Sequence, residues 1–448
     1  MRTMTKYFGT DGIRGKVNDV LTVDRAFTVG RYLGYYYSQK GREKIVIGKD
    51  TRLSSDVLEA ALAAGIAAEG CDAYLVGYCP TPSVCYLAVH EDFAAGAMIS
   101  ASHNPYYDNG IKVFSREGVK LQGEVVDLIE DYIDGKIEIP YAVGDHIGRI
   151  IKYPEGLEHY MEHICREFTT DLSGMKLALD CANGSSSYTA EQVLTRLGAS
   201  CFVMHAVPDG MNINTNCGST HPGSMQEMMK RGSFDLGLTF DGDADRLIAV
   251  RPDGELVDGD AMLYICGRYF KEKGILAKNT IVTTVMANLG LWKAMEREDI
   301  HLEKTDVGDK HVYDCMIRNG YIIGGEQSGH MIFSEHETTG DGLVTALILL
   351  RIMKETGKTI AELCEGLKIY PQLLVNVKVN DRQAAMEDRD VQDAIAKAEK
   401  ELHGNGRVFV RASGTEPLVR VMAEAETQTI CEEQCEKVAT VVRQKYGI

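Results

Sequence analysis

The sequence contains no run of five or more lysines and arginines, and nowhere do 18 apolar residues follow one another. Its charge is one-sided, with 48 lysines and arginines against 65 aspartates and glutamates and a formal net charge of −17. A chain so acidic repels a nucleic-acid backbone and an anionic membrane surface. The missing apolar stretch also leaves no signal for a membrane-spanning helix. We therefore expect neither a nucleic acid nor a membrane as a partner.

Cysteine is too scarce for a disulfide scaffold, because twelve cysteines are spread over 448 residues without a Cys-x-x-Cys pair. One close pair, Cys431 and Cys435, lies on a predicted helix whose apolar stripe continues through Val438 and Val442. We interpret this pair as core packing. Residues 1–11 hold no apolar segment of the kind that marks a secretory signal. These observations predict a reduced chain in the cytoplasm.

The length of the chain allows about three domains. A β-branched run followed by a small polar turn and a helical pattern occurs three times, beginning at Lys44, Lys176 and Thr280. Such alternation is typical of α/β layers with largely parallel strands. We predict three similar α/β domains with mostly parallel mixed sheets, plus a smaller C-terminal α+β domain, around a central cleft. The predicted domains span 1–155, 156–255, 256–369 and 370–448.

The last predicted domain differs because its apolar runs alternate as strands, over 373–379, 407–410 and 418–425, instead of pairing each strand with a helix. A helical pattern then closes the chain. Thr429 and Glu432 have the spacing of a capping box, so we expect Thr429 to cap this helix.

A serine stands where a buried strand should end, in Ser100-Ala-Ser-His-Asn-Pro105 after the apolar run Ala97-Met-Ile. The Asn-Pro step fixes a turn there, which holds the hydroxyl of Ser102 at the exit of the strand. Ser102 is therefore a candidate nucleophile. Neighbours on a tight turn usually point apart, so His103 need not be its base. The alternative is a plain Ser/Asn turn without chemistry.

Three carboxylates stand at alternate positions in Asp241-Gly-Asp-Ala-Asp-Arg246, directly after the predicted strand Leu236–Phe240. Packed so closely they repel one another unless a cation lies between them. An EF-hand would need glycine at the sixth position and glutamate at the twelfth, where Arg246 and Pro252 stand. Mg²⁺, with few carboxylates and a phosphate, suits the loop better. The alternative is an acidic turn exposed to solvent.

A third loop, Arg411-Ala-Ser-Gly-Thr-Glu-Pro417, joins two predicted strands, and Arg420 follows on the second of them. Small residues expose backbone N–H groups, hydroxyls add donors, and two guanidinium groups can bind an anion bidentately. This composition predicts a phosphate-binding loop. The alternative is an ordinary hairpin turn.

Two further glycine-rich segments give weaker signals. Gly324-Gly-Glu-Gln-Ser-Gly-His330 offers Glu326 as an acceptor and Ser328 as a donor for sugar hydroxyls. His330 alone is more often a satisfied core residue. Tyr7-Phe-Gly-Thr-Asp-Gly-Ile-Arg-Gly15 adds Arg14 on another turn. Each segment could equally be structural.

Together these loops resemble the α-D-phosphohexomutase family over nearly the whole chain, and within it the bacterial phosphoglucosamine mutase branch. The segments that carry the resemblance are Phe8–Gly15, Ser100–Pro105, Cys217-Gly-Ser-Thr-His221 and Gly325–His330. One departure is Lys310-His311 in Val307-Gly-Asp-Lys-His-Val312, where the family pattern has Arg-Tyr. The departure affects the local contacts of that loop.

The resemblance implies a role for each matched residue. Ser102 would carry the transferable phosphate and, with Asp241, Asp243 and Asp245, would hold one Mg²⁺ per chain. The residues expected around the transferring group are Arg14, Lys112 and Arg246. Those expected to bind the substrate are Gly308, Glu326, Ser328, Arg411, Ser413, Gly414, Thr415 and Arg420.

The implied activity is the isomerisation of glucosamine 6-phosphate to glucosamine 1-phosphate. It would proceed through a phosphoserine enzyme and a sugar 1,6-bisphosphate, which serves as intermediate and activator. The product would feed UDP-N-acetylglucosamine and cell-wall synthesis, and the chain could form a homodimer. Three alternatives stay open: a phosphomannomutase/phosphoglucomutase, for which we expect another residue at Gln327, a metal-dependent phosphatase, and a sugar-phosphate sensor without chemistry.

Overall fold

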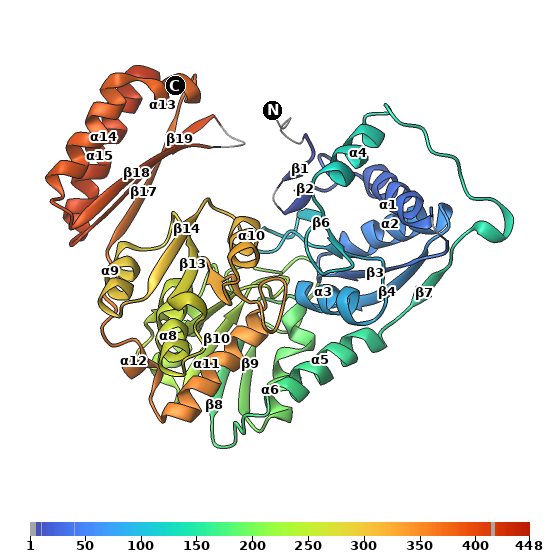
Figure 1. Ribbon diagram of the computed structural model, residues 1–448, viewed down its shortest axis with the longest axis horizontal. Coiled ribbons are helices and arrows are strands. Elements are labelled where there is room, and N and C mark those ends of the chain that lie inside the picture. The colour runs from blue at the N-terminus through green and yellow to red at the C-terminus, as the bar shows by residue number, and fades with distance from the viewer. Residues whose placement is uncertain (1–5, 10, 40, 414–416) are drawn as a thin grey trace. The chain divides into compact units, whose positions relative to one another are not determined.

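The computed structural model describes residues 6–9, 11–39, 41–413 and 417–448. The chain forms two compact units. The first takes the chain up to Met286 together with Ile300–Glu365, and the second takes Ala287–Asp299 and Gly366–Ile448. Figure 1 shows the secondary structure of both units.

The first sheet of the first unit has the strand order β1-β2-β6-β5-β3-β4-β7. Its centre is parallel, because β3 pairs with β4 and β5 in the same direction, whereas β5, β6, β2 and β1 pair antiparallel. The strands are β1 Phe8–Gly9, β2 Gly12–Lys16, β3 Lys44–Lys49, β4 Asp72–Tyr78, β5 Ala95–Ile99, β6 Asp108–Ser115 and β7 Ile150–Lys152. The helices in this part of the chain are α1 Val23–Ser38, α2 Ser55–Ala68, α3 Thr81–His90, α4 Glu124–Ile133, the 3₁₀ turn Gly144–His146 and α5 Glu155–Glu167.

The second sheet has the order β12-β11-β10-β8-β9, with β9, β8 and β10 parallel and β11 and β12 antiparallel to their neighbours. Every residue of β10 is buried, as expected for a strand covered on both faces. The strands are β8 Lys176–Asp180, β9 Ser200–Met204, β10 Leu236–Phe240, β11 Leu247–Val250 and β12 Leu256–Val257. The helices here are the 3₁₀ turn Ser185–Tyr188, α6 Ala190–Arg196 and α7 Gly223–Arg231.

The third sheet has the order β14-β13-β15-β16, parallel except for the β15–β16 pair. Its strands are β13 Thr280–Thr284, β14 His301–Thr305, β15 Ile323–Gly325 and β16 Met331–Phe333. The helices are α8 Gly259–Glu272, the 3₁₀ turn Ala277–Asn279, α10 Asp309–Asn319, α11 Gly342–Thr356 and α12 Ile360–Leu363.

The second unit contains an antiparallel sheet of order β17-β19-β18, with α14 and α15 covering one face of it (Figure 1). Its strands are β17 Gln372–Lys378, β18 Gly406–Ala412 and β19 Leu418–Ala425, and its helices are α9 Leu289–Arg297, α13 Arg382–Glu387, α14 Arg389–Glu401 and α15 Gln428–Tyr446. Cys431 and Cys435 are fully buried in its core, which confirms their interpretation as packing residues.

These layers confirm three similar α/β domains and a smaller C-terminal α+β domain, whereas the central cleft stays a prediction. The strands β3, β8 and β13 begin at the three predicted positions Lys44, Lys176 and Thr280. The predicted helix cap is wrong. Thr427 caps α15, because its extended backbone lets its hydroxyl accept from the N–H of Ile430 at 3.3 Å. Thr429 already lies inside the helix. Across the described residues, we find no helix that combines the length and the apolar character needed to cross a bilayer.

Candidate active site

Ser102 lies just beyond the carboxyl end of β5, and only 1% of its surface is exposed. Its hydroxyl donates to Oδ2 of Asp241 at 2.6 Å. Its backbone N–H donates to Oγ of Ser100 at 2.9 Å, and its φ of +52° is in the left-handed region. The turn thereby points the Ser102 hydroxyl at the acidic loop Asp241–Asp245. The structure thus brings together two segments that the sequence singled out separately.

Two side chains from distant segments hold this turn in place. Arg52 donates to the carbonyl oxygens of Ser102 and Asn104 at 3.0 and 2.7 Å, and the amide of Asn214 donates to the same oxygens at 2.9 and 3.1 Å. Arg52 is itself paired with the buried carboxylate of Asp50. A left-handed φ at a residue with a side chain costs free energy. These four hydrogen bonds offset that cost.

His103 lies closer to Ser102 than the sequence led us to expect. Its Nδ1 is 3.2 Å from Oγ of Ser102, since the left-handed turn brings the neighbouring side chains together. Burial and the positive charges of Arg246 and Arg14 lower the pKa of His103 to about 4. The imidazole is therefore uncharged at neutral pH and can exchange a hydrogen bond with the hydroxyl.

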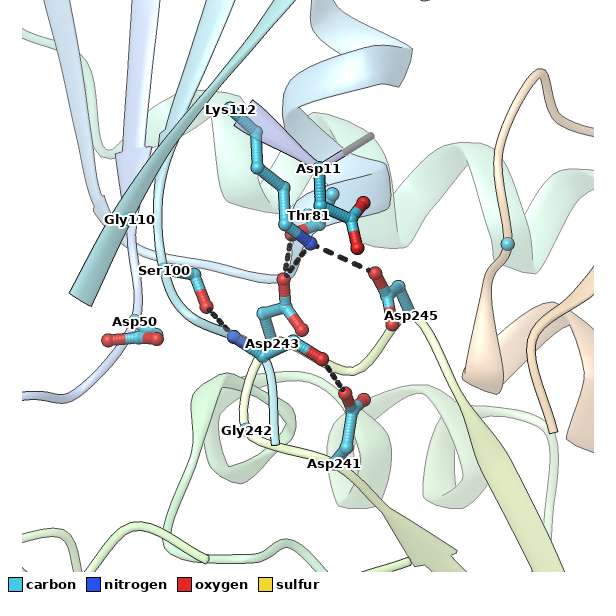
Figure 2. A network of polar contacts seen from close by, with 12 residues as sticks. Asp11, Asp50, Thr81, Ser100, Gly110, Lys112, Asp241, Gly242, Asp243 and Asp245 are labelled. Atoms are coloured by element: carbon cyan, nitrogen blue, oxygen red, sulfur yellow. Dashed lines mark hydrogen bonds and ion pairs between the residues drawn. The ribbon is translucent and has the colours of Figure 1, made fainter. Parts of the chain in front are cut away.

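The three aspartates of the acidic loop are buried together after β10. Oδ2 of Asp243 accepts from Oγ1 of Thr81 at 2.5 Å and from Nζ of Lys112 at 2.6 Å, and Lys112 also donates to Oδ2 of Asp245 at 3.1 Å. Figure 2 shows the Lys112 side chain reaching Asp243 and Asp245, with Asp241, at the start of the loop, lying away from the ammonium. The Lys112 ammonium thus bridges the carboxylates of Asp243 and Asp245.

The remaining oxygens of the loop fit a divalent cation. Oδ1 of Asp243 and Oδ1 of Asp245 are buried without a hydrogen-bond partner, and the three aspartates offer ligand oxygens within 4.8 Å of one another. Burial and the charges of Asp245 and Asp243 raise the pKa of Asp241 to about 8. A hard divalent cation relieves this repulsion, and oxygen ligands are those that Mg²⁺ prefers.

The three predicted cations, Arg14, Lys112 and Arg246, all lie at this site. Burial alone would lower the pKa of Lys112, but Asp243 and Asp245 outweigh it and raise that pKa, so the ammonium stays charged. Nε of Arg246 is 3.8 Å from Oδ1 of Asp245. Arg14 approaches both His103 and the carboxylate of Asp11, the latter at 3.3 Å.

A chain of charges extends from this site toward the third sheet. Lys120 forms ion pairs with Asp11 and with Asp309 at the start of α10, the latter at 2.5 Å. His330 is buried, and the backbone N–H of Gly340 donates to its Nε2 at 3.1 Å, which leaves Nδ1 to carry the ring proton. That nitrogen lies 3.6 Å from Oδ1 of Asp245.

The predicted sugar-binding residues lie on two adjoining loops of the third sheet. Oε1 of Glu326 accepts from the backbone N–H of Gly308 at 3.0 Å, which brings these two residues together. Gly308 has a φ of +121°, a conformation suited to glycine. Ser328 is exposed on the turn between β15 and β16, where its hydroxyl can meet a ligand.

The predicted phosphate-binding residues belong to the second unit. Arg411 on β18 stands directly opposite Arg420 on β19, and burial together with the charge of Arg420 lowers the pKa of Arg411. Ser413 is buried, and its carbonyl accepts from Arg382 at 2.5 Å. Gly414 and Thr415 lie outside the described residues. Facing cations of this kind favour an anion between them.

Sequence reasoning did not single out Arg52, Asn214, Thr81 or the Asp11–Lys120 pair. A signal existed for Arg52, because it follows the predicted strand at Lys44 just as Ser102 follows its own strand, and the carboxyl ends of parallel strands meet at one edge of a sheet. Asn214 gave no such signal. It lies in an irregular segment far from any predicted strand end.

Four family models match this chain. They are described as phosphoglucomutase/phosphomannomutase alpha/beta/alpha domains I, II and III and the C-terminal domain, and they match residues 5–139, 158–254, 258–370 and 374–441. A protein of Lachnoclostridium phytofermentans is 50% identical over 443 residues, covering 99% of both chains. This chain belongs to the phosphoglucomutase/phosphomannomutase family.

Other members of this family show the same full-length agreement. The relatives from Lachnoclostridium phytofermentans and Geobacillus thermodenitrificans are both named phosphoglucosamine mutase, and the latter is 48% identical over 99% of this chain and 100% of its own. The crystal structure of a phosphoglucomutase/phosphomannomutase family protein from Burkholderia thailandensis matches with a TM-score of 0.81 at 22% identity, over 99% of this chain and 100% of its own. That likeness shows the common fold.

Proposed function

We propose that this chain is a phosphoglucosamine mutase, which interconverts glucosamine 6-phosphate and glucosamine 1-phosphate. The observation that carries the proposal is the buried Ser102 hydroxyl, held 2.6 Å from the acidic loop among three cations. The full-length relatives named phosphoglucosamine mutase, at about 50% identity, support the choice of an amino sugar as substrate.

In the first half-reaction, phosphorylated Ser102 gives its phosphoryl group to the O1 hydroxyl of glucosamine 6-phosphate. The bond between phosphorus and Oγ breaks, the bond to O1 forms, and the hydroxyl proton leaves as Oγ regains one. Arg14, Lys112 and Arg246 bind the oxygens of the transferring group, because such transfer depends mainly on positioning and charge neutralisation. Asp241, Asp243, Asp245 and the phosphoserine would hold Mg²⁺, which when bound would supply further charge neutralisation.

In the second half-reaction, the resulting 1,6-bisphosphate turns around and returns its 6-phosphoryl group to Ser102, which leaves glucosamine 1-phosphate. The same bisphosphate can phosphorylate a resting enzyme, so it acts as intermediate and activator. Glu326, Ser328 and Gly308 would bind the sugar. Arg411, Ser413 and Arg420, with Gly414 and Thr415, would bind the phosphate that is not transferred.

The free cysteines bear on the cellular location of the proposed reaction. The twelve cysteines are all free thiols, which suits a cytoplasmic enzyme supplying the precursor of UDP-N-acetylglucosamine and of cell-wall polymers. The substrate is a small amino-sugar phosphate, and a homodimer stays a prediction.

A coupled assay that compares glucosamine, glucose and mannose phosphates side by side tests this proposal. We expect the highest kcat/KM with glucosamine phosphate. Preference for glucose or mannose phosphate would instead indicate a phosphomannomutase/phosphoglucomutase. Release of inorganic phosphate without isomerisation would indicate a phosphatase, and binding without either reaction would indicate a sensor.

A further inference from the structure

A second cluster of metal-ligating side chains lies on the sheet that carries the acidic loop, and the proposed reaction does not use it. Asp180 is the last residue of β8, His205 directly follows β9, and Cys217 lies on the irregular segment before α7. A carboxylate oxygen, a ring nitrogen and the sulfur of these residues lie within 4.8 Å of one another. The chain therefore places three different donor atoms at one point.

The cluster is preformed by its surroundings. Asp180 and Cys217 are completely buried, while the His205 side chain keeps 30% of its surface exposed. Backbone N–H groups of Ala182 and Gly218 donate to Oδ1 and Oδ2 of Asp180 at 2.9 and 3.0 Å, which fixes the orientation of the carboxylate. Oδ1 of Asp180 retains a further lone pair.

The ring of His205 points its Nδ1 into the cluster. This nitrogen is buried and forms an ion pair with Oδ2 of Asp180 at 3.0 Å, and its interaction with that carboxylate raises the pKa of His205. Sγ of Cys217 lies 3.9 Å from Nδ2 of Asn183 and also interacts with the backbone of Asn214. A cation at this point would replace the proton shared by Nδ1 of His205 and Oδ2 of Asp180, and it would also lie within reach of the Cys217 sulfur.

We propose that Asp180, His205 and Cys217 bind a zinc ion through a carboxylate oxygen, Nδ1 and the thiolate, with water as a fourth ligand. Sulfur, nitrogen and oxygen donors together select a borderline-soft cation such as Zn²⁺, which takes four ligands tetrahedrally. The all-oxygen loop Asp241–Asp245 selects a hard cation by the same rule. Binding of the metal displaces two protons to solvent, the thiol proton of Cys217 and the proton on Nδ1 of His205.

The zinc ion has a positioning role in this arrangement. Asn214, which holds the carbonyl oxygens of Ser102 and Asn104, lies between His205 and Cys217 in the sequence. Its backbone N–H also donates to the carbonyl of Ala182 at 2.9 Å, two residues from Asp180. Zinc therefore fastens both ends of the segment 205–217 to β8 and stabilises the part of it that supports the Ser102 turn.

Metal analysis of the full chain, purified without chelators and dialysed after incubation with zinc, tests the site. We expect about one zinc ion per chain that Cys217→Ser and His205→Gln no longer retain. Cys201→Ser serves as the matched control, because Cys201 is a free thiol on the neighbouring strand β9 and should leave the zinc content unchanged.

Cobalt substitution separates this site from the acidic loop. Cobalt at the proposed site gives a thiolate-to-metal charge-transfer band, which the all-oxygen loop cannot produce. We expect the band in the wild type and in Cys201→Ser, and its loss in Cys217→Ser. If Cys217→Ser fails to fold by circular dichroism, the band in His205→Gln decides, and it should be weakened or shifted.

Absence of the band from the wild type, or its persistence unchanged in both variants, would overturn the proposal. The proposal does not depend on the activity, because neither the zinc content nor the cobalt band requires turnover.

Discussion

The Ser102 site of the first unit and the β18–β19 hairpin of the second unit arrange their charged side chains in opposite ways. Around Ser102, buried carboxylates and cations alternate, as in the contacts of Lys112 with Asp243 and Asp245. On the hairpin, Arg411 and Arg420 face each other as like charges. The first site is organised by its own contacts, whereas the second has the charge that the proposed phosphate binding requires. This contrast suits a division between phosphoryl transfer and phosphate recognition.

Replacing Ser102 should have the largest effect. Ser102→Ala removes the phosphoryl carrier, so we expect mutase turnover to fall by several orders of magnitude while KM changes little. Ser100→Ala is the control, because the Ser100 hydroxyl contacts the N–H of Ser102 and the carboxylate of Asp50 and has no part in the proposed transfer, so most of the activity should remain. Steady-state kinetics of both variants measure this. Loss of activity in Ser100→Ala alone would assign the carrier to Ser100.

Removing the divalent cation should come next. We expect chelation by EDTA to abolish activity and added Mg²⁺ to restore it, because the aspartates repel one another and cannot position the phosphoserine alone. The chain should stay folded, since Lys112 continues to pair with Asp243 and Asp245. Activity and circular dichroism measured on the same samples check this. Full activity in EDTA, or cooperative unfolding at room temperature, would contradict it.

A change on the hairpin should have an intermediate effect. Arg420→Ala removes a charged hydrogen bond to phosphate worth about 1.5 to 3 kcal/mol, so we expect kcat/KM to fall roughly tenfold to over a hundredfold. The loss should be similar in the forward and reverse directions, because each orientation leaves one phosphate at the hairpin.

The control for the hairpin is Arg389→Ala, an exposed arginine at the start of α14 in the same unit. We expect its kcat/KM to stay within about twofold of the wild type, as for most surface substitutions. Equal losses in the two variants, or a loss in only one direction for Arg420→Ala, would contradict the proposal that the hairpin binds the phosphate that is not transferred.

The smallest effect is expected behind the Ser102 turn. Asn214→Ala removes two hydrogen bonds to the carbonyls of Ser102 and Asn104, but Arg52 still holds both oxygens. We expect a loss of about 1 kcal/mol, or roughly fivefold in kcat, with KM unchanged. An increase in KM at constant kcat would show that Asn214 acts on binding instead of on the position of Ser102.

The sequence predicted best where structure follows from local patterns. The strands at Lys44, Lys176 and Thr280 and the loops at strand ends could be read from alternating residue types. The predicted cap of α15 was wrong because Thr427 and Thr429 stand two residues apart, and the backbone conformation decides which of them caps the helix. The predicted domain boundaries stay predictions.

Contacts between distant residues could not be read in this way. Asn214 and Ser102 lie 112 positions apart, and Lys120 and Asp309 lie 189 apart. Nothing local marks such pairs, because the tertiary fold alone brings them together. The left-handed φ of Ser102, which turns His103 toward the hydroxyl, is likewise fixed by Arg52 and Asn214 from outside the loop.

Locating the phosphoryl group by mass spectrometry tests the central claim most directly. The unphosphorylated chain is incubated with glucosamine 1,6-bisphosphate, digested and sequenced by fragmentation. We predict one phosphoryl group, on Ser102, which disappears when glucosamine 6-phosphate is added while the bisphosphate reappears. A phosphoryl group on another residue, or one on Ser102 that the sugar phosphate cannot remove, would contradict the account.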